Sequence, residues 1–272
     1  MSKEQEKFVI FGNPVAHSKS PQMQNAGFES LDYNGIYEKH QLLDGNTIKQ
    51  TFLQNNYEGA NITVPHKEFA YKNADEVRGL AQKIKAVNTY INENGKVIAY
   101  NTDAPGFLKA IESFGKVKSV LLLGAGGTAK AIALALQENN IEVTVLNRSE
   151  GKLKFFKNEG INCYSWEDFE KEVKEKEFDL IVNSTSAGLK DEYLPCDKEL
   201  LQTLFKSAKY AFDCVYGKIT PFLALARENG LKIKYGEDML LYQGVLAFEY
   251  FTKQRADNKV VEAMRNGLKD KS

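Results

Sequence analysis

Residues Val120 to Ala129 read VLLLGAGGTA, an apolar run that leads into a glycine turn and then into a helix-forming segment. This order is typical of the first strand, turn and helix of a βαβ dinucleotide-binding fold. Gly124 permits the tight turn, Gly126 lets backbone N–H groups approach a pyrophosphate, and the small Ala129 allows the helix to pack on the strand. We therefore expect a dinucleotide to bind at Gly124, Ala125, Gly126, Gly127, Thr128 and Ala129.

The next expected strand ends in Asn147, Arg148 and Ser149. An NAD site normally has a carboxylate at about this distance after the glycines, where it binds the ribose 2′-hydroxyl. A guanidinium suits a 2′-phosphate instead, so we expect Arg148 to pair with that phosphate and to stack on adenine, with Lys152 adding charge. Asn147 and Ser149 are expected to donate hydrogen bonds. A surface arginine is the alternative, but the glycine loop upstream favours NADP over NAD.

The composition narrows the classes of partner. Among 272 residues, 36 basic and 36 acidic side chains leave no net charge, so we expect no nucleic-acid or membrane partner. The first seven residues lack the apolar core of a signal peptide, and the longest apolar region, residues 239–251, is interrupted by Gln243 and Glu249. We expect a soluble cytoplasmic protein, monomeric or homodimeric, that acts on small molecules.

The three cysteines, Cys163, Cys196 and Cys214, are an odd number without Cys-x-x-Cys spacing. That pattern argues against a disulfide framework and against a structural zinc site. We expect no metal site, and we expect all three cysteines to be small buried residues.

Apolar strand-like runs separated by helix-length segments predict an α/β fold. The first series lies at residues 8–11, 36–38, 60–64, 87–91 and 97–100, and the second at 120–123, 143–146, 180–183, 211–214 and 231–235. After Asp238 the pattern is helical, at residues 239–254 and 258–268. We therefore expect two domains with hinges near Asp103 and Gly236: residues 1–103, mostly parallel and completed by helices in 237–272, and a Rossmann-type domain of residues 104–236.

Short motifs in order across nearly the whole chain resemble the shikimate dehydrogenase family. They are FGNPVAHSKSP at 11–21, GANITVPHKE at 59–68, AVNT at 86–89, NTDAPG at 101–106, the glycine loop, NRS at 147–149, NSTSAG at 183–188, and Gly236 with Tyr242 and Gln243. The resemblance implies NADPH-dependent reduction of 3-dehydroshikimate to shikimate, a step toward chorismate and the aromatic amino acids. It also implies that the first domain binds the substrate and the second binds NADP.

Reduction of a ketone requires a hydride and a proton for the developing alkoxide. Lys67 can supply that proton, and Asp103 can orient the lysine ammonium and relay a proton in the oxidative direction. Taken alone, Lys67 resembles a solvated surface charge and Asp103 resembles a helix N-cap. The resemblance implies instead that both are catalytic, and we predict a Lys67/Asp103 pair.

The remaining expected site residues come from the motifs. Ser18 and Ser20 are serines that the resemblance assigns to the substrate carboxylate, although Ser20 before Pro21 also reads as an N-cap. Polar residues in apolar surroundings are expected to complete a pocket for a polyhydroxylated ring: Asn61, Thr63, Asn88 and Gln243. The resemblance places four residues on the nicotinamide side: Thr185, Ser186, Tyr216 and Gly236. It also implies that Tyr216 contacts the substrate.

Two positions depart from the family pattern. His66 stands where an aromatic phenylalanine is common, and Gln24 replaces a frequent histidine. The His66 ring, when charged, would lower the proton affinity of Lys67, but we favour an orientation away from it because neighbours on an extended strand face opposite sides. His17 is expected to be structural and His40 to lie at a strand end.

Two other functions are compatible with parts of the pattern. One is a quinate/shikimate dehydrogenase paralogue that accepts NAD, against which Arg148 argues. The other is a catalytically silent NADPH-binding sensor, since a fold and a cofactor loop do not prove chemistry. The joint presence of Lys67, Asp103 and the two serines argues against the sensor.

Overall fold

The computed structural model describes residues 4–172 and 176–269 and divides the chain into two compact units. The first unit is Met1–Gly106 with Leu241–Ser272, and the second is Phe107–Leu240. The boundaries lie within a few residues of the expected hinges, inside α5 (Asp103–Ile111) and α11 (Glu237–Thr252). Residues 1–3, 173–175 and 270–272, which the domain prediction included, lie outside the described part of the chain.

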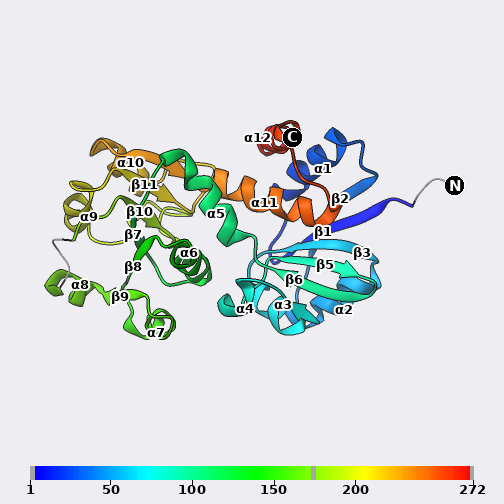
Figure 1. Cartoon of the computed structure of the whole chain (residues 1–272), viewed down its shortest axis with the longest axis horizontal. Coiled ribbons are helices and arrows are strands. Elements are labelled where there is room, and N and C mark those ends of the chain that lie inside the picture. Colours follow the sequence, from blue (N-terminus) through cyan, green and yellow to red (C-terminus); the bar gives the residue numbers. More distant parts are fainter. Residues whose placement is uncertain (1–3, 173–175, 270–272) are drawn as a thin grey trace. The chain divides into compact units, whose positions relative to one another are not determined.

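The first unit is built on a mixed sheet (Figure 1). In chain order its elements are β1 (Glu6–Gly12), α1 (Ser20–Ser30), β2 (Gly35–Gln41), η1 (Gly45–Thr47), α2 (Ile48–Gln54), β3 (Tyr57–Ile62), α3 (Lys67–Asn73), β4 (Glu76–Val77), α4 (Ala81–Ile84), β5 (Thr89–Glu93) and β6 (Lys96–Tyr100), followed after the second unit by α11 and α12 (Asn258–Lys269). The strand order is β2-β1-β3-β5-β6-β4. β1 pairs in parallel with β2 and β3, whereas β5 is antiparallel to both β3 and β6.

The C-terminal helices pack against α1 within this unit. Gln24, which is fully buried, donates from Nε2 to the carbonyl of Gly244 at 3.0 Å, and Lys19 Nζ donates to the carbonyl of Leu268 at 3.0 Å. Phe28 of α1 packs on Phe248 of α11, with ring centroids 5.3 Å apart, and on Phe8 of β1, with centroids 5.0 Å apart. The last helices therefore complete the core that the first strands begin.

The second unit has the architecture of a doubly wound parallel sheet. Its elements are η2 (Glu112–Phe114), β7 (Ser119–Leu123), α6 (Gly127–Glu138), β8 (Glu142–Asn147), η3 (Glu150–Lys152), α7 (Lys154–Asn158), β9 (Asn162–Ser165), α8 (Trp166–Glu172), β10 (Leu180–Asn183), α9 (Lys198–Phe205), β11 (Tyr210–Asp213), α10 (Pro221–Glu228) and β12 (Lys232–Tyr235). All pairs are parallel in the order β12-β11-β10-β7-β8-β9. The order reverses between β7 and β10, and dinucleotides bind outside the carboxyl ends of the strands at such a point.

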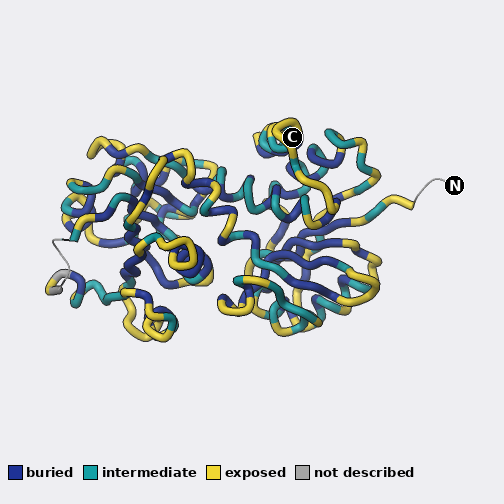
Figure 2. The backbone as a smooth tube through the Cα atoms, in the orientation of Figure 1, coloured by how far each residue is buried: buried dark blue, intermediate teal, exposed yellow. Residues whose placement is uncertain are grey.

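Each sheet is the centre of its own apolar core. In Figure 2 the central strands of both units are buried along most of their length. Leu121, Ile181 and Phe222 belong to the core of the second unit, and Phe11, Phe52 and Tyr90 belong to that of the first. These cores come from the apolar runs of the sequence, because alternate or continuous burial of such runs removes apolar surface from water.

The first sheet was expected to be mostly parallel, and three of its five described strand pairs are parallel. Two details differ from the sequence-based expectations. The short edge strands β4 and β9 were not predicted. Of the three cysteines, all expected to be buried, only Cys196 is buried, while Cys163 and Cys214 are half-buried.

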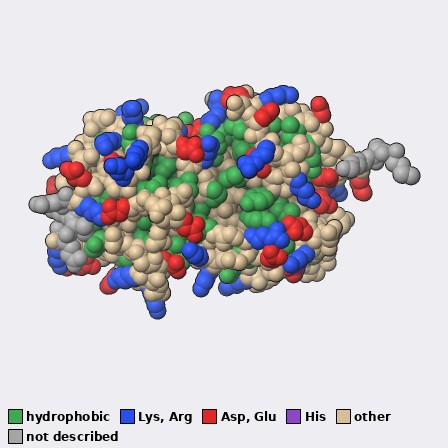
Figure 3. All heavy atoms as spheres, in the orientation of Figure 1, with side chains coloured by type: hydrophobic (Ala, Val, Ile, Leu, Met, Phe, Trp, Pro, Cys, Tyr) green, Lys and Arg blue, Asp and Glu red, His purple; other side chains and the backbone are tan. Residues whose placement is uncertain are grey.

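Acidic and basic side chains are interspersed over the face drawn in Figure 3. None of the helices in the described part of the chain has the length and apolar character needed to cross a membrane.

Candidate active site

The first unit brings Lys67 and Asp103 into direct contact. Lys67 begins α3 after a turn that the backbone N–H of His66 closes on the carbonyl of Thr63 at 3.0 Å. Asp103 begins α5, and its Oδ2 lies 2.5 Å from Lys67 Nζ. The lysine and aspartate side chains are 28% and 14% exposed, so the pair is reachable from solvent and yet mostly enclosed. An ammonium held this way can donate a proton to a ligand oxygen beside it.

The local sequence suggested that Asp103 is the N-cap of its helix, but in the structure it does not cap α5. The side-chain oxygen of Asn101 accepts from the backbone N–H groups of Asp103, at 3.1 Å, and of Ala104, at 3.3 Å. These are the bonds of an N-cap residue. The carboxylate of Asp103 is therefore left to bind Lys67 with one oxygen and Asn88 with the other, the latter at 3.0 Å.

Asn88 is the centre of a buried polar network around this pair. Its side chain is 2% exposed; Nδ2 donates to Asp103 and to Thr102 Oγ1 at 3.0 Å, and Oδ1 accepts from the backbone N–H of Thr102 at 2.8 Å. Gln243 joins through Oε1, which lies 3.4 Å from Asn88 Nδ2. Thr102 was not predicted, although its place between Asn101 and Asp103 in the NTD motif was a usable signal.

Asn61 lies in the same network on the side of the sheet core. Its Oδ1 accepts from the Tyr37 hydroxyl at 2.8 Å, and its Nδ2 donates to the carbonyl of Asn88 at 3.3 Å and to Thr89 Oγ1 at 3.2 Å. Burial raises the pKa of Tyr37 well above its ordinary value, so the phenol stays protonated and keeps donating. The amide of Asn61 thus holds protein groups that position Asn88.

The two predicted serines are adjacent at the start of α1. Ser18 Oγ donates to Ser20 Oγ at 3.2 Å and accepts from the backbone N–H of Ser20 at 3.2 Å. Ser20 is the first helical residue and Lys19 occupies the N-cap position, so the expected cap at Ser20 was wrong by one residue. Thr63 directly follows β3, and its backbone N–H donates to the carbonyl of Phe11 at 2.9 Å.

His66 is buried, and its ring is hydrogen-bonded to the segment between β2 and η1. Nε2 donates to the carbonyl of Leu42 at 2.7 Å, while Nδ1 has no hydrogen-bond partner among the described residues. The reason we gave for its orientation was wrong, because residue 66 has helical backbone angles and does not lie on an extended strand.

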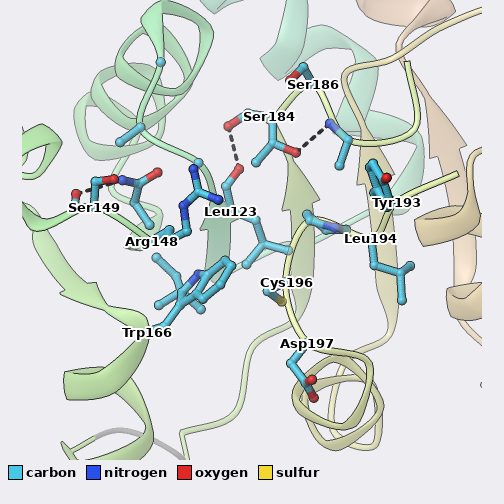
Figure 4. Close-up of a pocket in the computed structure, with 18 of the residues that line it drawn as sticks. Leu123, Arg148, Ser149, Trp166, Ser184, Ser186, Tyr193, Leu194, Cys196 and Asp197 are labelled. Carbon is cyan, nitrogen blue, oxygen red and sulfur yellow. Dashed lines mark hydrogen bonds between the residues drawn. The ribbon is translucent and has the colours of Figure 1, made fainter. Parts of the chain in front are cut away.

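The second unit contains a cavity of about 890 Å³ at the carboxyl ends of β7, β8 and β10 (Figure 4). Nine predicted cofactor residues line it: Gly124, Ala125, Gly126, Asn147, Arg148, Ser149, Lys152, Thr185 and Ser186. Gly127, Thr128 and Ala129 lie outside the lining, in the first turn of α6, and Ala129 is fully buried. Residues 191–198 and Trp166 also line the cavity and were not predicted.

Two glycines of this unit are required by geometry. Gly124 has φ +106°, which L side chains rarely adopt, and an added Cβ would lie 2.9 Å from the Thr185 methyl. At Gly236 an added Cβ would lie 2.3 Å from the carbonyl oxygen of Cys214. Gly124 thereby shapes the turn that opens α6, and Gly236 permits the close approach of two chain segments after β11 and β12.

The cavity fits a phosphorylated dinucleotide. Gly126 is the exposed N-cap residue of α6, where backbone N–H groups and the helix dipole favour a phosphate. Arg148 is exposed, and no described residue forms an ion pair with it, so its guanidinium is available for a 2′-phosphate. Cys196 in the wall stays a neutral thiol, because burial raises its pKa to about 12. Tyr216, 41% exposed after β11, belongs to the second unit.

Comparisons with known proteins agree over nearly the whole chain. Residues 10–90 match a shikimate dehydrogenase substrate binding domain, residues 108–196 a shikimate / quinate 5-dehydrogenase model, and residues 236–267 a shikimate 5′-dehydrogenase C-terminal domain. A shikimate dehydrogenase (NADP(+)) of Helicobacter hepaticus is 45% identical over 259 residues, 95% of each chain. One of Helicobacter pylori strain J99 is 41% identical over 96% of this chain and 98% of that protein.

A solved structure gives the same result. The crystal structure of shikimate 5-dehydrogenase from Thermus thermophilus, in complex with NADP(H) and shikimate, has a TM-score of 0.84 and 35% identity over 96% of this chain and 99% of that chain. The shikimate dehydrogenase of Aquifex aeolicus has a TM-score of 0.86 and 33% identity over 99% of this chain and all of that chain. With this identity and coverage, the chain belongs to the shikimate dehydrogenase family.

Proposed function

We propose that the protein catalyses the reversible, NADPH-dependent reduction of 3-dehydroshikimate to shikimate, a step toward chorismate and the aromatic amino acids. The named relatives are NADP(+)-dependent shikimate dehydrogenases, and the Thermus thermophilus structure holds both NADP(H) and shikimate. The observation that carries the proposal within this chain is the Lys67–Asp103 pair in its buried polar network.

The roles of the residues follow from the chemistry of a ketone. When bound, NADPH supplies the hydride that reaches the carbonyl carbon. The Lys67 ammonium donates its proton to the carbonyl oxygen as that oxygen gains negative charge, so the products are an alcohol and a neutral amine. Asp103 holds the ammonium in place and is a route by which the amine regains a proton. In the oxidative direction the amine accepts the hydroxyl proton.

We assign substrate binding to the first unit and NADP binding to the second. Around Lys67 and Asp103, the amide of Gln243 suits a ring hydroxyl, and Asn88, whose amide is bonded to Thr102 and Asp103, holds that carboxylate at the substrate side. The hydroxyls of Ser18 and Ser20 suit a carboxylate at a helix start. Asn61 and Thr63 complete this side. In the second unit the glycine loop suits the pyrophosphate and Arg148 suits the 2′-phosphate; Thr185, Ser186, Tyr216 and Gly236 are assigned to the nicotinamide end.

A four-way assay tests the proposal. The purified protein is supplied with shikimate or quinate, each with NADP or NAD, and kcat/KM is measured from the near-ultraviolet absorbance of the reduced cofactor. We expect the highest value for shikimate with NADP. A preference for quinate or NAD would favour the paralogue, and NADPH binding without any shikimate-dependent change in absorbance would favour a sensor.

We also propose that the protein works in the cytoplasm as a monomer or homodimer. Fractionation of cells that express it and light scattering of the purified protein test these two points separately.

A further inference from the structure

The cavity of the second unit has an aromatic wall that the sequence motifs do not predict. Trp166, the only tryptophan among the 272 residues, lines the cavity together with Arg148 and Lys152. In Figure 4 its indole lies on the same side of the cavity as Arg148. The ring is half-buried and rests partly against the apolar core of the unit, so one side is anchored and part of its surface remains in the cavity.

Strand register explains why the two side chains are neighbours. β8 and β9 pair in parallel, and their last pair is Asn147 with Ser165. Arg148 and Trp166 are the residues that directly follow these two strands, so both leave the sheet at its carboxyl edge from adjacent strands. The Ser165 hydroxyl donates to Asp168 Oδ2 at 2.6 Å and accepts from the Asp168 backbone N–H at 3.2 Å. These bonds fix the first turn of α8, which carries Trp166.

A flat apolar surface beside an exposed guanidinium matches one ligand fragment in particular. A purine ring stacks on an indole face, and a phosphate on the adjoining ribose pairs with arginine. Tyr193 also lines the cavity, but its side chain is 74% exposed and lacks the anchoring of Trp166.

We propose that Trp166 is a specificity-determining residue that stacks on the adenine ring of the cofactor while Arg148 holds the 2′-phosphate. The inference rests on the proposed NADP-dependent function and adds a residue to it. It assigns to the indole a share in the recognition of the adenine base, in addition to the stacking expected of Arg148.

Adenosine 2′,5′-bisphosphate is the appropriate probe, because it carries adenine and a 2′-phosphate but no nicotinamide. Since the chain has a single tryptophan, the intrinsic indole fluorescence reports on this position alone. We expect titration of the wild-type protein with the probe to change that fluorescence saturably. Nicotinamide mononucleotide should leave it unchanged.

Three variants separate stacking from packing, with the dissociation constant of the probe measured by calorimetry. Trp166→Leu keeps apolar contact with the core but lacks the flat ring, and it should weaken binding about tenfold. Trp166→Phe keeps a ring and should stay within about threefold of wild type. Phe155→Leu, which alters a half-buried ring of α7 outside the cavity lining, should bind the probe like wild type. All three variants should bind shikimate as tightly as the wild-type protein does.

Two results would overturn the inference. One is a wild-type protein that binds the probe without a change in indole fluorescence. The other is Trp166→Leu with an unchanged thermal midpoint and an unchanged dissociation constant. Failure of the wild-type protein to bind the probe at all would overturn the NADP assignment together with the stacking, which distinguishes the two levels of the proposal.

Discussion

At the scale of single residues, the structure separates side chains that are engaged by the protein from those that remain available. Asn61 and Asn88 have their amides bonded to protein groups, whereas no described residue pairs with Arg148. The sequence motifs predicted both kinds without distinguishing them. Hydrogen-bond partners come from different strands, and their convergence depends on register that a single motif does not contain.

Arg148 offers a residue-scale prediction about cofactor choice. Arg148→Ala should lower kcat/KM for NADPH by about 10- to 100-fold, because a charge-assisted hydrogen bond contributes about 1.5–3 kcal/mol. The value for NADH should change little, since NADH has no 2′-phosphate. Steady-state kinetics with both cofactors measure this, and Arg227→Ala, at an exposed position of α10, is the matched control. Equal losses with NADPH and NADH would contradict the assignment.

At the scale of elements, the cap of α5 links stability to the site. Asn101→Ala removes the acceptor for the N–H groups of Asp103 and Ala104, and it should lower the free energy of unfolding by about 1 kcal/mol. Because the same turn orients the Asp103 carboxylate, kcat with shikimate should fall as well. Urea denaturation and steady-state kinetics measure the two effects.

Asp257→Ala is the control for that prediction. Asp257 accepts from the backbone N–H of Val260 at 2.9 Å at the start of α12, away from the Lys67 network. Asp257→Ala should lose about as much stability as Asn101→Ala does, and it should keep the wild-type kcat. If Asn101→Ala lost stability but kept a wild-type kcat, the cap would not position Asp103.

Asp213 at the end of β11 gives an element-scale prediction about pH. Its buried carboxylate accepts from Thr220 Oγ1 at 2.6 Å, Asn183 Nδ2 at 3.0 Å and the Val215 N–H at 2.9 Å. Burial raises its pKa above the ordinary 3.8, although these bonds act in the opposite direction. Between the unfolded-state pKa and the raised folded-state pKa, the folded state binds more protons at Asp213 than the unfolded state does. The contribution of Asp213 to the free energy of unfolding therefore declines as pH rises from about 4 through the folded-state pKa.

Asp213→Asn removes that titration. Wild-type stability minus variant stability, from urea denaturation at several pH values, should therefore shrink as pH rises from about 4 to about 7. A difference that is constant or grows over this range would contradict the raised pKa. The variant should be the less stable protein at low pH, because an amide offers one acceptor atom to three donors.

The elements themselves were largely predictable. Runs such as residues 8–11 and 180–183 are apolar enough to be read as strands, and both are strands in the structure. β4, with two residues, and β9, with the sequence NCYS, lie at sheet edges and have little apolar pattern. Trp166 was not predicted as a site residue because its position beside Arg148 follows from the pairing of β8 with β9, a strand that was itself not predicted.

At the scale of the whole molecule, two units imply two separable binding events. Hydrogen exchange should show that shikimate alone protects amides of the first unit near residues 61–67 and 101–103. NADP alone should protect residues 124–129 and 147–152 of the second unit. Mass spectrometry of peptides measures the amide protection in the protein with shikimate alone and in the protein with NADP alone. Protection of the glycine loop by shikimate alone, with none near Lys67, would contradict the assignment of ligands to units.

The most direct test of the Lys67–Asp103 pair is the kcat of Lys67→Ala for shikimate oxidation at saturating shikimate and NADP. Loss of the proton-transferring ammonium should lower kcat by about 10²- to 10⁴-fold, with unchanged thermal stability and with shikimate and NADP still binding by calorimetry. A folded Lys67→Ala enzyme whose kcat stays within about threefold of wild type would contradict the proposed chemistry.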